Sequence, residues 1–452
     1  MLLQYKHNIV IFVMSLVSSI FLNQHTFITM KKIRLLFILA LSFLLYQTQI
    51  LQAQQVVEAT IPIKGRVISD DSRNPLEYAS VSINNTNIST VTNQDGFFSL
   101  RIPASARNYQ LKVQHLGYSN VSIPVITLID KDDNVIRMRT GSIQLDEVEI
   151  LSGDGAHLVR EALRSITTNY DEDPNMMVAF YREAIKKGSR HLSLVEAVLD
   201  VYKASYKSYR DDQARIYIGR KATDISAKDT VFMKFQGGIS DALKLDIAKH
   251  PEIVFGENGD GYTFNIEGVI TMDDRPHYII DFFPYTTIDE ILFRGKIYLD
   301  VESLAFKRME FNMNVEDRKE AASIFIKKKP SSMRVSAESA KYTVDYVERG
   351  GKWYFNYSQT EVQFKVRWRK RSFFGLFSSN YTIFSEIAIT DRYEENVQRF
   401  PRKERIRSTD VIAEKVEYFQ DPEFWGDYTV IEPDKEITNA IKRLSDKLLR
   451  RE

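Results

Sequence analysis

Residues 92–103, TNQDGFFSLRIP, combine a tight-turn sequence with an alternating apolar run, and this pattern decides the fold of the N-terminal region. The turn is Asn93–Gly96, where polar side chains bond nearby backbone and the glycine can adopt a positive φ. Phe98, Leu100 and Ile102 then fall on one face of a strand. We therefore predict a structural corner of a β-domain, with Phe98 in its core.

Short strands with frequent turn signals surround this corner. Seven strands in about 80 residues are typical of a β-sandwich. We expect them at 61–68, 79–84, 90–92, 97–103, 109–118, 119–127 and 135–139. The predicted fold class is mainly β, with a seven-stranded sandwich over residues 57–140.

The remainder predicts a larger antiparallel β-domain with flanking helices. A linker at 141–155 precedes a helix and the large domain at 156–433, and an amphipathic helix follows at 434–452. Lys187–Ser189 forms the turn of a long hairpin, and a shorter helix is expected at 239–250.

Residues 1–54 have the order of a leader with a signal peptide. Lys31 and Lys32 form a positive start, and an apolar run at 33–46, interrupted only by Arg34 near its beginning, follows; this run is short for a bilayer span. Ala53 offers a cleavage point, although Leu51 is a poor residue for its −3 position. An earlier apolar run at 9–22 leaves two alternatives, a true start at Met30 or a double leader.

Composition narrows the function classes. The chain has 452 residues, 44% of them hydrophobic, and a net charge of +1, which argues against a dedicated nucleic-acid partner. It has no cysteine, which excludes thiolate chemistry and a lipid-modified N-terminal cysteine. We predict a protein that is exported and periplasmic, or peripherally associated with the outer membrane.

Residues 63–103 and 111–125 together resemble the carboxypeptidase-regulatory-like domain, a transthyretin-like sandwich at the N-terminus of many exported bacterial proteins. This sequence differs from the family's usual G-T-x-x-G-T segment, because Asn85 and Ser89 stand at its two glycine positions. The resemblance implies a fold and no peptidase activity. The positions that carry the fold motif are Gly65, Asn93, Asp95, Gly96, Phe98, Leu116, Gly117 and Tyr118.

A second resemblance concerns FRGKIYLDVESLAFKRMEF at 293–311, which is similar to the strand-turn-strand unit of LolA/LolB-like half-barrels. Segments at 158–170, 180–185, 196–206 and 423–433 look like the region that follows the sandwich in a family of exported proteins of uncharacterised function.

Catalytic and metal-binding motifs are weak. The histidines are scattered without zinc-ligand spacing, and DKDDN at 130–134 lacks the glycine and glutamate of a calcium loop. GISDA at 238–242 approaches a nucleophile elbow, but Ala242 replaces its second glycine, so we interpret Ser240 or Asp241 as a helix cap. We expect no catalytic residue, no metal and no cofactor.

Two charged features remain as candidates. Arg182 and Glu196 lie on the two arms of the predicted hairpin, either as a substrate-binding pair or as a structural ion pair. The second feature is 363–380, where cations occupy one strand face and an apolar tip follows. It is either a solvated edge or a contact with an anionic membrane or partner, through Lys365, Arg367, Arg369, Arg371, Phe373, Phe374 and Phe377.

These observations favour a non-enzymatic envelope protein that binds an apolar or envelope ligand, or that docks to an outer-membrane protein or a lipid surface. The alternatives are a hydrolase acting on envelope polymers and a purely structural assembly module. Convergent carboxylates or a serine–histidine pair in a pocket would favour the hydrolase, whereas an apolar concave sheet face would favour binding.

Overall fold

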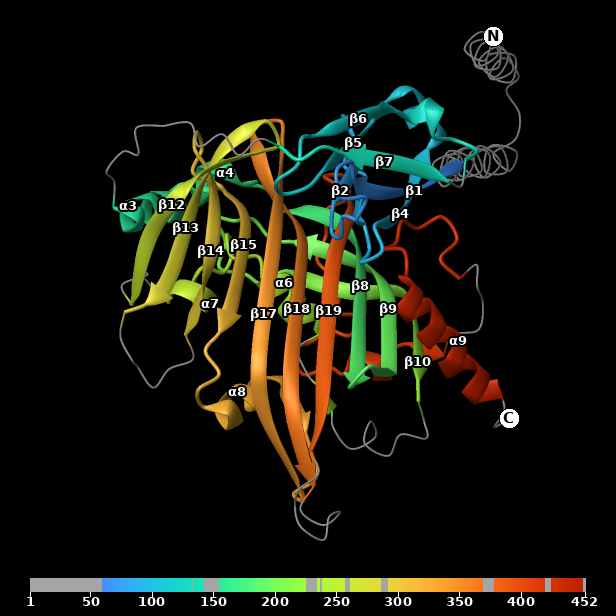
Figure 1. The fold of residues 1–452 in the computed structure, drawn as a ribbon, viewed down its shortest axis with the longest axis vertical. Coiled ribbons are helices and arrows are strands. Elements are labelled where there is room, and N and C mark those ends of the chain that lie inside the picture. The colour runs from blue at the N-terminus through green and yellow to red at the C-terminus, as the bar shows by residue number, and fades with distance from the viewer. Residues whose placement is uncertain are drawn as a thin grey trace, which may run out of the picture. The chain divides into compact units, whose positions relative to one another are not determined.

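The computed structural model describes residues 59–131, 133–141, 154–224, 234–235, 238–256, 261–285, 292–368, 378–418 and 424–449. Its helices and strands belong to one compact unit, Thr60–Glu452 (Figure 1). In the described part of the chain, none of the helices has the length and apolar character needed to cross a bilayer.

The N-terminal strands form the predicted sandwich, and the mainly β fold is confirmed. One sheet has the order β4-β1-β7, with β1 and β7 parallel, and the other has the order β3-β2-β5-β6. The strands are β1 (Thr60–Ser69), β2 (Ser80–Ile83), β3 (Ser89–Val91), β4 (Phe97–Pro103), β5 (Gln110–Gln114), β6 (Val121–Pro124) and β7 (Asn134–Met138). Short 3-10 helices lie at Ala104–Asn108 and Val125–Thr127.

The corner at Asn93–Gly96 has the turn chemistry that the sequence predicts. The side-chain oxygen of Asn93 accepts hydrogen bonds from the backbone N–H groups of Asp95 and Phe97 at 3.0 and 2.9 Å. Gly96 has a φ of +79°, and a Cβ there would lie 2.5 Å from the Val67 carbonyl oxygen. Phe98 is 1% exposed, which confirms its place in the core.

The larger part of the chain forms an 11-stranded sheet. Adjacent strands in this sheet are antiparallel, except that β10 and β20 pair in parallel. In sheet order the strands are β12 (Tyr262–Met272), β13 (Arg275–Pro284), β14 (Phe293–Asp300), β15 (Phe306–Met313), β17 (Met333–Arg349), β18 (Lys352–Trp368), β19 (Ser378–Tyr393), β8 (Asn175–Lys187), β9 (Arg190–Lys203), β10 (Gln213–Thr223) and β20 (Glu417–Tyr418). A separate pair joins β11 (Lys234–Phe235) to β16 (Ile326–Lys328).

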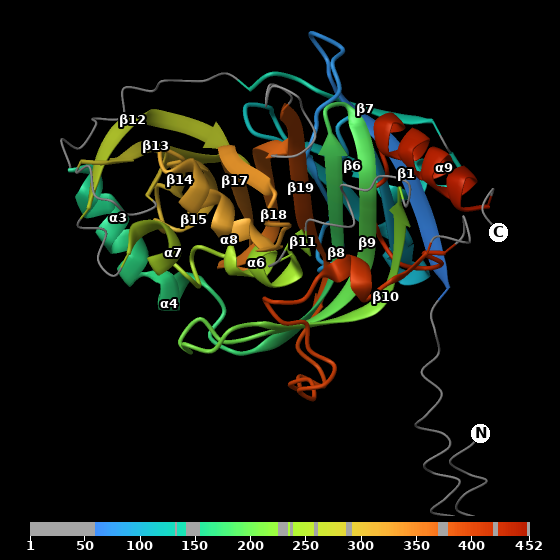
Figure 2. The ribbon, with the colours of Figure 1, turned by 90° about the horizontal axis from the view of Figure 1, so that it is seen from below.

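Both faces of the sheet are covered around β8, β9 and β19. Figure 2 shows the sheet curving around short helices, with α9 and the sandwich on its outer side. Burial on both faces explains why the run Met176–Tyr181 of the interior strand β8 is entirely apolar, since both of its alternating sides pack against other parts of the protein. The inner-side helices are α3 (Gly155–Arg164), α4 (Ile166–Asn169), α6 (Gly238–Lys244), α7 (Glu252–Phe255) and α8 (Arg318–Phe325); α9 is Lys435–Leu449, and a 3-10 turn lies at Ile412–Glu414.

The helix predicted at 239–250 is wrong in its extent. Helix α6 ends at Lys244, and the chain then turns into a buried polar cluster around Asp246. The Asp246 carboxylate lies 2.6 Å from the Lys203 ammonium and accepts a hydrogen bond from the Tyr346 hydroxyl at 3.0 Å. The same hydroxyl accepts the Ala248 N–H at 3.0 Å, so a tertiary contact replaces helical bonding there.

The C-terminal segment joins the sandwich to the outer face of the sheet. The Asn93 amide donates to the Glu432 carbonyl oxygen at 3.0 Å, and the Asp95 carboxylate accepts the Lys435 N–H at 2.8 Å. Asp95 therefore lies at the start of α9. Apolar contacts between β8, β9, β19 and the buried Ile437 of α9 continue this junction.

Candidate functional site

An apolar cavity of about 400 Å³ lies between the inner face of the sheet and the helices α6 and α8. Its volume is within the range of small-molecule sites, about 300–1,000 Å³. Most of its lining is apolar, and the few polar side chains come from β8, β18, β19 and α6. The lining includes Glu183, Asp241, Ala242, Lys244, Leu245, Ile253, Phe293, Phe311, Met313, Ile324, Phe325, Tyr342, Thr360, Val362, Ile383 and Ser385.

Aromatic rings form the wall contributed by β14, β15 and β17. Phe311 and Tyr342 are cross-strand partners whose rings stack with centroids 5.0 Å apart. Phe293 meets the Phe311 ring edge to face at 5.6 Å. Such pairs stabilise the arrangement of the rings beyond what apolar burial alone provides.

Glu183 contributes an unusual polar group at the β8 side of the cavity. It is half-buried, and its carboxylate has one hydrogen-bond partner among the described residues, the Tyr181 hydroxyl, which donates at 3.1 Å. Burial raises the pKa of the Glu183 carboxyl above its ordinary value, and the Tyr181 hydroxyl offsets only part of this rise. An acid in this environment gains from a ligand that supplies a hydrogen-bond donor.

Helix α6 adds two further charges to the lining. Asp241 and Lys244 are one helical turn apart and therefore share a side of α6. The surrounding protein raises the pKa of Asp241 and Lys244 opposes this rise. Because the Asp241 side chain is exposed, water hydrates its charge, so a bound ligand gains less from Asp241 than from the half-buried Glu183.

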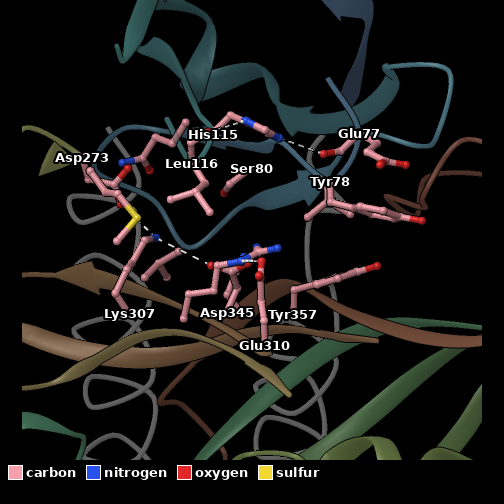
Figure 3. A pocket seen from close by; sticks show the side chains of 16 residues that line it. Glu77, Tyr78, Ser80, His115, Leu116, Asp273, Lys307, Glu310, Asp345 and Tyr357 are labelled. Atoms are coloured by element: carbon pink, nitrogen blue, oxygen red, sulfur yellow. Dashed lines mark hydrogen bonds and ion pairs between the residues drawn. The ribbon is translucent and has the colours of Figure 1, made fainter. Parts of the chain in front are cut away.

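A second, polar pocket of about 280 Å³ lies between the sandwich and the outer face of the sheet (Figure 3). The Lys307 ammonium is buried in its wall, 2.9 Å from Asp273 and 4.0 Å from Asp345, and it donates to the Tyr346 carbonyl oxygen at 2.9 Å. Arg308 pairs with Asp345 and lies 2.7 Å from Glu310. Each of the three sheet carboxylates in this pocket therefore has a cation.

These pairings reduce the capacity of the polar pocket for acid–base chemistry. Burial alone would raise the pKa of Asp273, but Lys307 outweighs it and holds that pKa below its ordinary value. Both ring nitrogens of His115 face backbone carbonyl oxygens, of Leu116 at 3.0 Å and of Glu77 at 3.1 Å. The arrangement is typical of a structural junction.

Leu116–Tyr118 of the fold motif lie on the sandwich side of this junction. Leu116 packs against Met272 and Tyr298 of the large sheet, and Tyr118 meets the His115 ring at 5.2 Å. Gly117 has a φ of +80°. A Cβ on Gly65 would lie 2.8 Å from the Phe98 ring, so that position needs glycine for close packing.

Ser240 and His250 line one small pocket of about 250 Å³, which is the arrangement that would favour a hydrolase. However, Nδ1 of His250 lies 3.2 Å from Glu252, and in the described part of the chain no hydrogen bond joins it to Ser240. Ser240 and Asp241 lie inside the first turn of α6, which begins at Gly238, so their predicted capping role is wrong.

The predicted register of Arg182 and Glu196 is confirmed. The guanidinium lies 2.8 Å from Glu196 and 3.0 Å from Glu386, and it donates to the Ile431 carbonyl oxygen at 2.7 Å. Arg182 is 1% exposed. The pair is a structural ion network that holds the C-terminal segment.

No group of three or more His, Cys, Asp or Glu side chains is placed to hold a metal ion within the described ranges. In the segment considered for calcium, the Asn134 amide donates to the carbonyl oxygens of Lys64, Leu128 and Lys131 at 2.9, 3.0 and 3.0 Å. It therefore acts as a loop-closing donor.

The basic stripe is described only in part. Phe364 and Val366 are buried, while Lys365 is half-buried and Arg367 is exposed, as the alternation predicts. The remaining residues of the predicted contact, Arg369, Arg371, Phe373, Phe374 and Phe377, lie outside the described residues, so membrane or partner contact stays a prediction.

Sequence reasoning missed the apolar cavity and Glu183. The lining comes from six strands and three helices that are far apart in the chain. One signal was present, because Glu183 shares its side of β8 with the buried Met177, Ala179 and Tyr181. A carboxylate at a core-facing position of an apolar strand is a reason to look for a site.

Comparison with protein families identifies the sandwich. Residues 63–150 match the family model described as the CarboxypepD_reg-like domain. Apart from the first residues of β1, all seven strands fall in this range, so the predicted resemblance is confirmed. None of the curated proteins matches the chain.

Solved structures similar to the chain include a candidate outer membrane lipoprotein-sorting protein domain from Vibrio parahaemolyticus, with 9% identity, 54% of this chain and 94% of that chain covered, and a TM-score of 0.24. A LolA superfamily protein from Nitrosomonas europaea has 8% identity, coverage of 56% and 97%, and a TM-score of 0.23. A DUF1329 family protein from Desulfovibrio piger has 14% identity, coverage of 54% and 93%, and a TM-score of 0.21.

Proposed function

We propose that this protein is an exported, non-catalytic binding protein of the cell envelope that holds an apolar ligand against the inner face of its large sheet. The apolar cavity carries the proposal. Its aromatic wall and the Glu183 carboxylate, which has no cation partner among the described residues, are the combination expected of a small-molecule site, in which apolar area supplies affinity and a few polar groups orient the ligand.

The leader and the sandwich support the location. The charged-then-apolar order at 31–46 is that of a secretory signal, and the CarboxypepD_reg-like match fits the resemblance to N-terminal modules of exported bacterial proteins. The sandwich would serve to attach or orient the binding domain, since its contacts with the sheet are structural.

The state of the carboxylates supports a non-catalytic role. Acid–base catalysis requires a group that exchanges a proton with the substrate. In the polar pocket Asp273, Glu310 and Asp345 are ion-paired, and the Ser240–His250 pair is not assembled. The hydrolase alternative therefore has less support than binding.

Binding of N-phenyl-1-naphthylamine, a neutral probe that fluoresces in apolar surroundings, tests the proposal. We expect the wild type to bind it, and Thr360→Trp to weaken binding at least about tenfold, because the new ring occupies the cavity. Thr343→Trp is the matched control, since Thr343 lies beside Tyr342 on β17 and faces the opposite side of the sheet.

Equal binding by both variants would place the probe elsewhere and contradict the proposal, as would the absence of binding by the wild type. Mass spectrometry of protein purified from its native envelope would then identify the bound molecule.

A further inference from the structure

The polar and apolar groups of the cavity lie at different positions across the sheet. Phe293, Phe311 and Tyr342 come from β14, β15 and β17, whereas Glu183 comes from β8, which β18 and β19 separate from them. Ser385 on β19 is the register partner of Glu183 and also lines the cavity. The cavity therefore has an aromatic end and a polar end, as an amphiphile would require.

The polar end carries an excess of negative charge. Its charged side chains among the described residues are Glu183 and Asp241 against Lys244, which are two carboxylates and one ammonium. Among the described residues, no cation lies at ion-pair distance from Glu183. Its carboxylate accepts a hydrogen bond only from the Tyr181 hydroxyl. Elsewhere in the fold, the buried Glu196 and Asp246 carboxylates have Arg or Lys partners.

A carboxylate shielded from water without a cation is costly, and a ligand cation that pairs with it recovers that cost through a charge-assisted hydrogen bond. A ligand carboxylate would instead meet like charge, and a hydroxyl would offer a weaker bond. The unpaired acid therefore selects among head groups.

We propose that the cavity binds a cationic amphiphile, an inference that rests on the proposed function. The amine head group would lie on the Glu183 carboxylate, and the hydrocarbon chain would extend toward the wall formed by Phe293, Phe311 and Tyr342. The head group would lie between β8, β19 and α6, in reach of Ser385 and Asp241.

Displacement of N-phenyl-1-naphthylamine by three ligands of one chain length, dodecylamine, dodecanol and dodecanoate, measures head-group preference at concentrations below aggregation. We expect the amine to displace the probe from the wild type at a concentration at least about tenfold lower than the alcohol, and the carboxylate to be weakest, since hydrogen bonds to charged groups exceed neutral ones by about that factor.

Glu183→Gln should remove the preference for the amine, so that the amine and the alcohol displace the probe at about the same concentration. Glu361→Gln is the matched control, because it also removes one negative charge but lies next to Thr360 and Val362 on β18 and faces the opposite side of the sheet. It should keep the amine preference.

Three outcomes would overturn the inference. An amine no better than the alcohol on the wild type excludes the head-group assignment without any variant. An amine preference that survives Glu183→Gln, or that Glu361→Gln removes equally, assigns it to another charge. In each of these outcomes the probe still binds and the proposed function stands, whereas a wild type that does not bind the probe contradicts both.

Discussion

The apolar cavity lies on the inner face of the large sheet, and the polar pocket lies on its outer face. The same strands supply both, because successive side chains of a strand point to opposite faces: Phe311 lines the apolar cavity, and the preceding Glu310 lines the polar pocket. On the outer face the sheet carboxylates of the pocket have cations, and on the inner face Glu183 has none among the described residues. Paired charges indicate a junction, and an unpaired one indicates a site.

The largest expected effect comes from removing a cation from the polar pocket on the outer face. Lys307→Met should destabilise the protein by about 3–5 kcal/mol, because it removes the buried cation and leaves the half-buried Asp273 and Asp345 with less compensation. Urea unfolding measures the loss. Lys296→Met is the control, since its pairing with Glu267 is exposed and should contribute at most about 1 kcal/mol. Similar small losses in both would show that the polar pocket does not depend on its ion pairs.

A smaller effect is expected when Glu183 loses its single partner. Tyr181→Phe removes the hydroxyl that donates to the Glu183 carboxylate and should cost about 1–3 kcal/mol in unfolding free energy. Tyr342→Phe removes a hydroxyl from the same cavity that has no hydrogen-bond partner among the described residues, so we expect a change within about 0.5 kcal/mol. Equal changes would mean that the Tyr181 hydroxyl does not support Glu183.

The sandwich could be predicted from sequence because its signals are local. The turn at Asn93–Gly96 is determined by side chains within four residues, and its family resemblance covers the same stretch. The Arg182–Glu196 register was also predictable, since a tight turn fixes the pairing of a hairpin.

The inner face could not be predicted in the same way. Helix α6 ends at Lys244 because Asp246 binds Lys203 and Tyr346, which lie 43 and 100 residues away in the chain. The cavity likewise depends on which distant strands become neighbours. Only the acid at a core-facing position of β8 marked the site in the sequence itself.

The smallest expected effect concerns how stability changes with pH. Burial raises the pKa of Glu183 above its ordinary value of 4.5, so between these two pKa values the unfolded chain has lost a proton that the folded protein keeps. The unfolding free energy of the wild type therefore falls as pH rises through this interval, and below it the residue imposes no cost. Glutamine does not titrate. Glu183→Gln should consequently gain stability relative to the ligand-free wild type as pH increases.

Unfolding in urea at several pH values measures this difference. The groups that face Glu183 are Tyr181 on its own strand, Ser385 on β19, and Asp241 and Lys244 on α6, and all are unchanged in the variant. Glu361→Gln shows what the loss of one negative charge does on the opposite face. A Glu183→Gln difference that stays constant with pH, or that declines as pH rises, would mean that the acid already has a compensating cation. The carboxylate on the inner face would then have a cation partner, as the sheet carboxylates of the polar pocket do on the outer face.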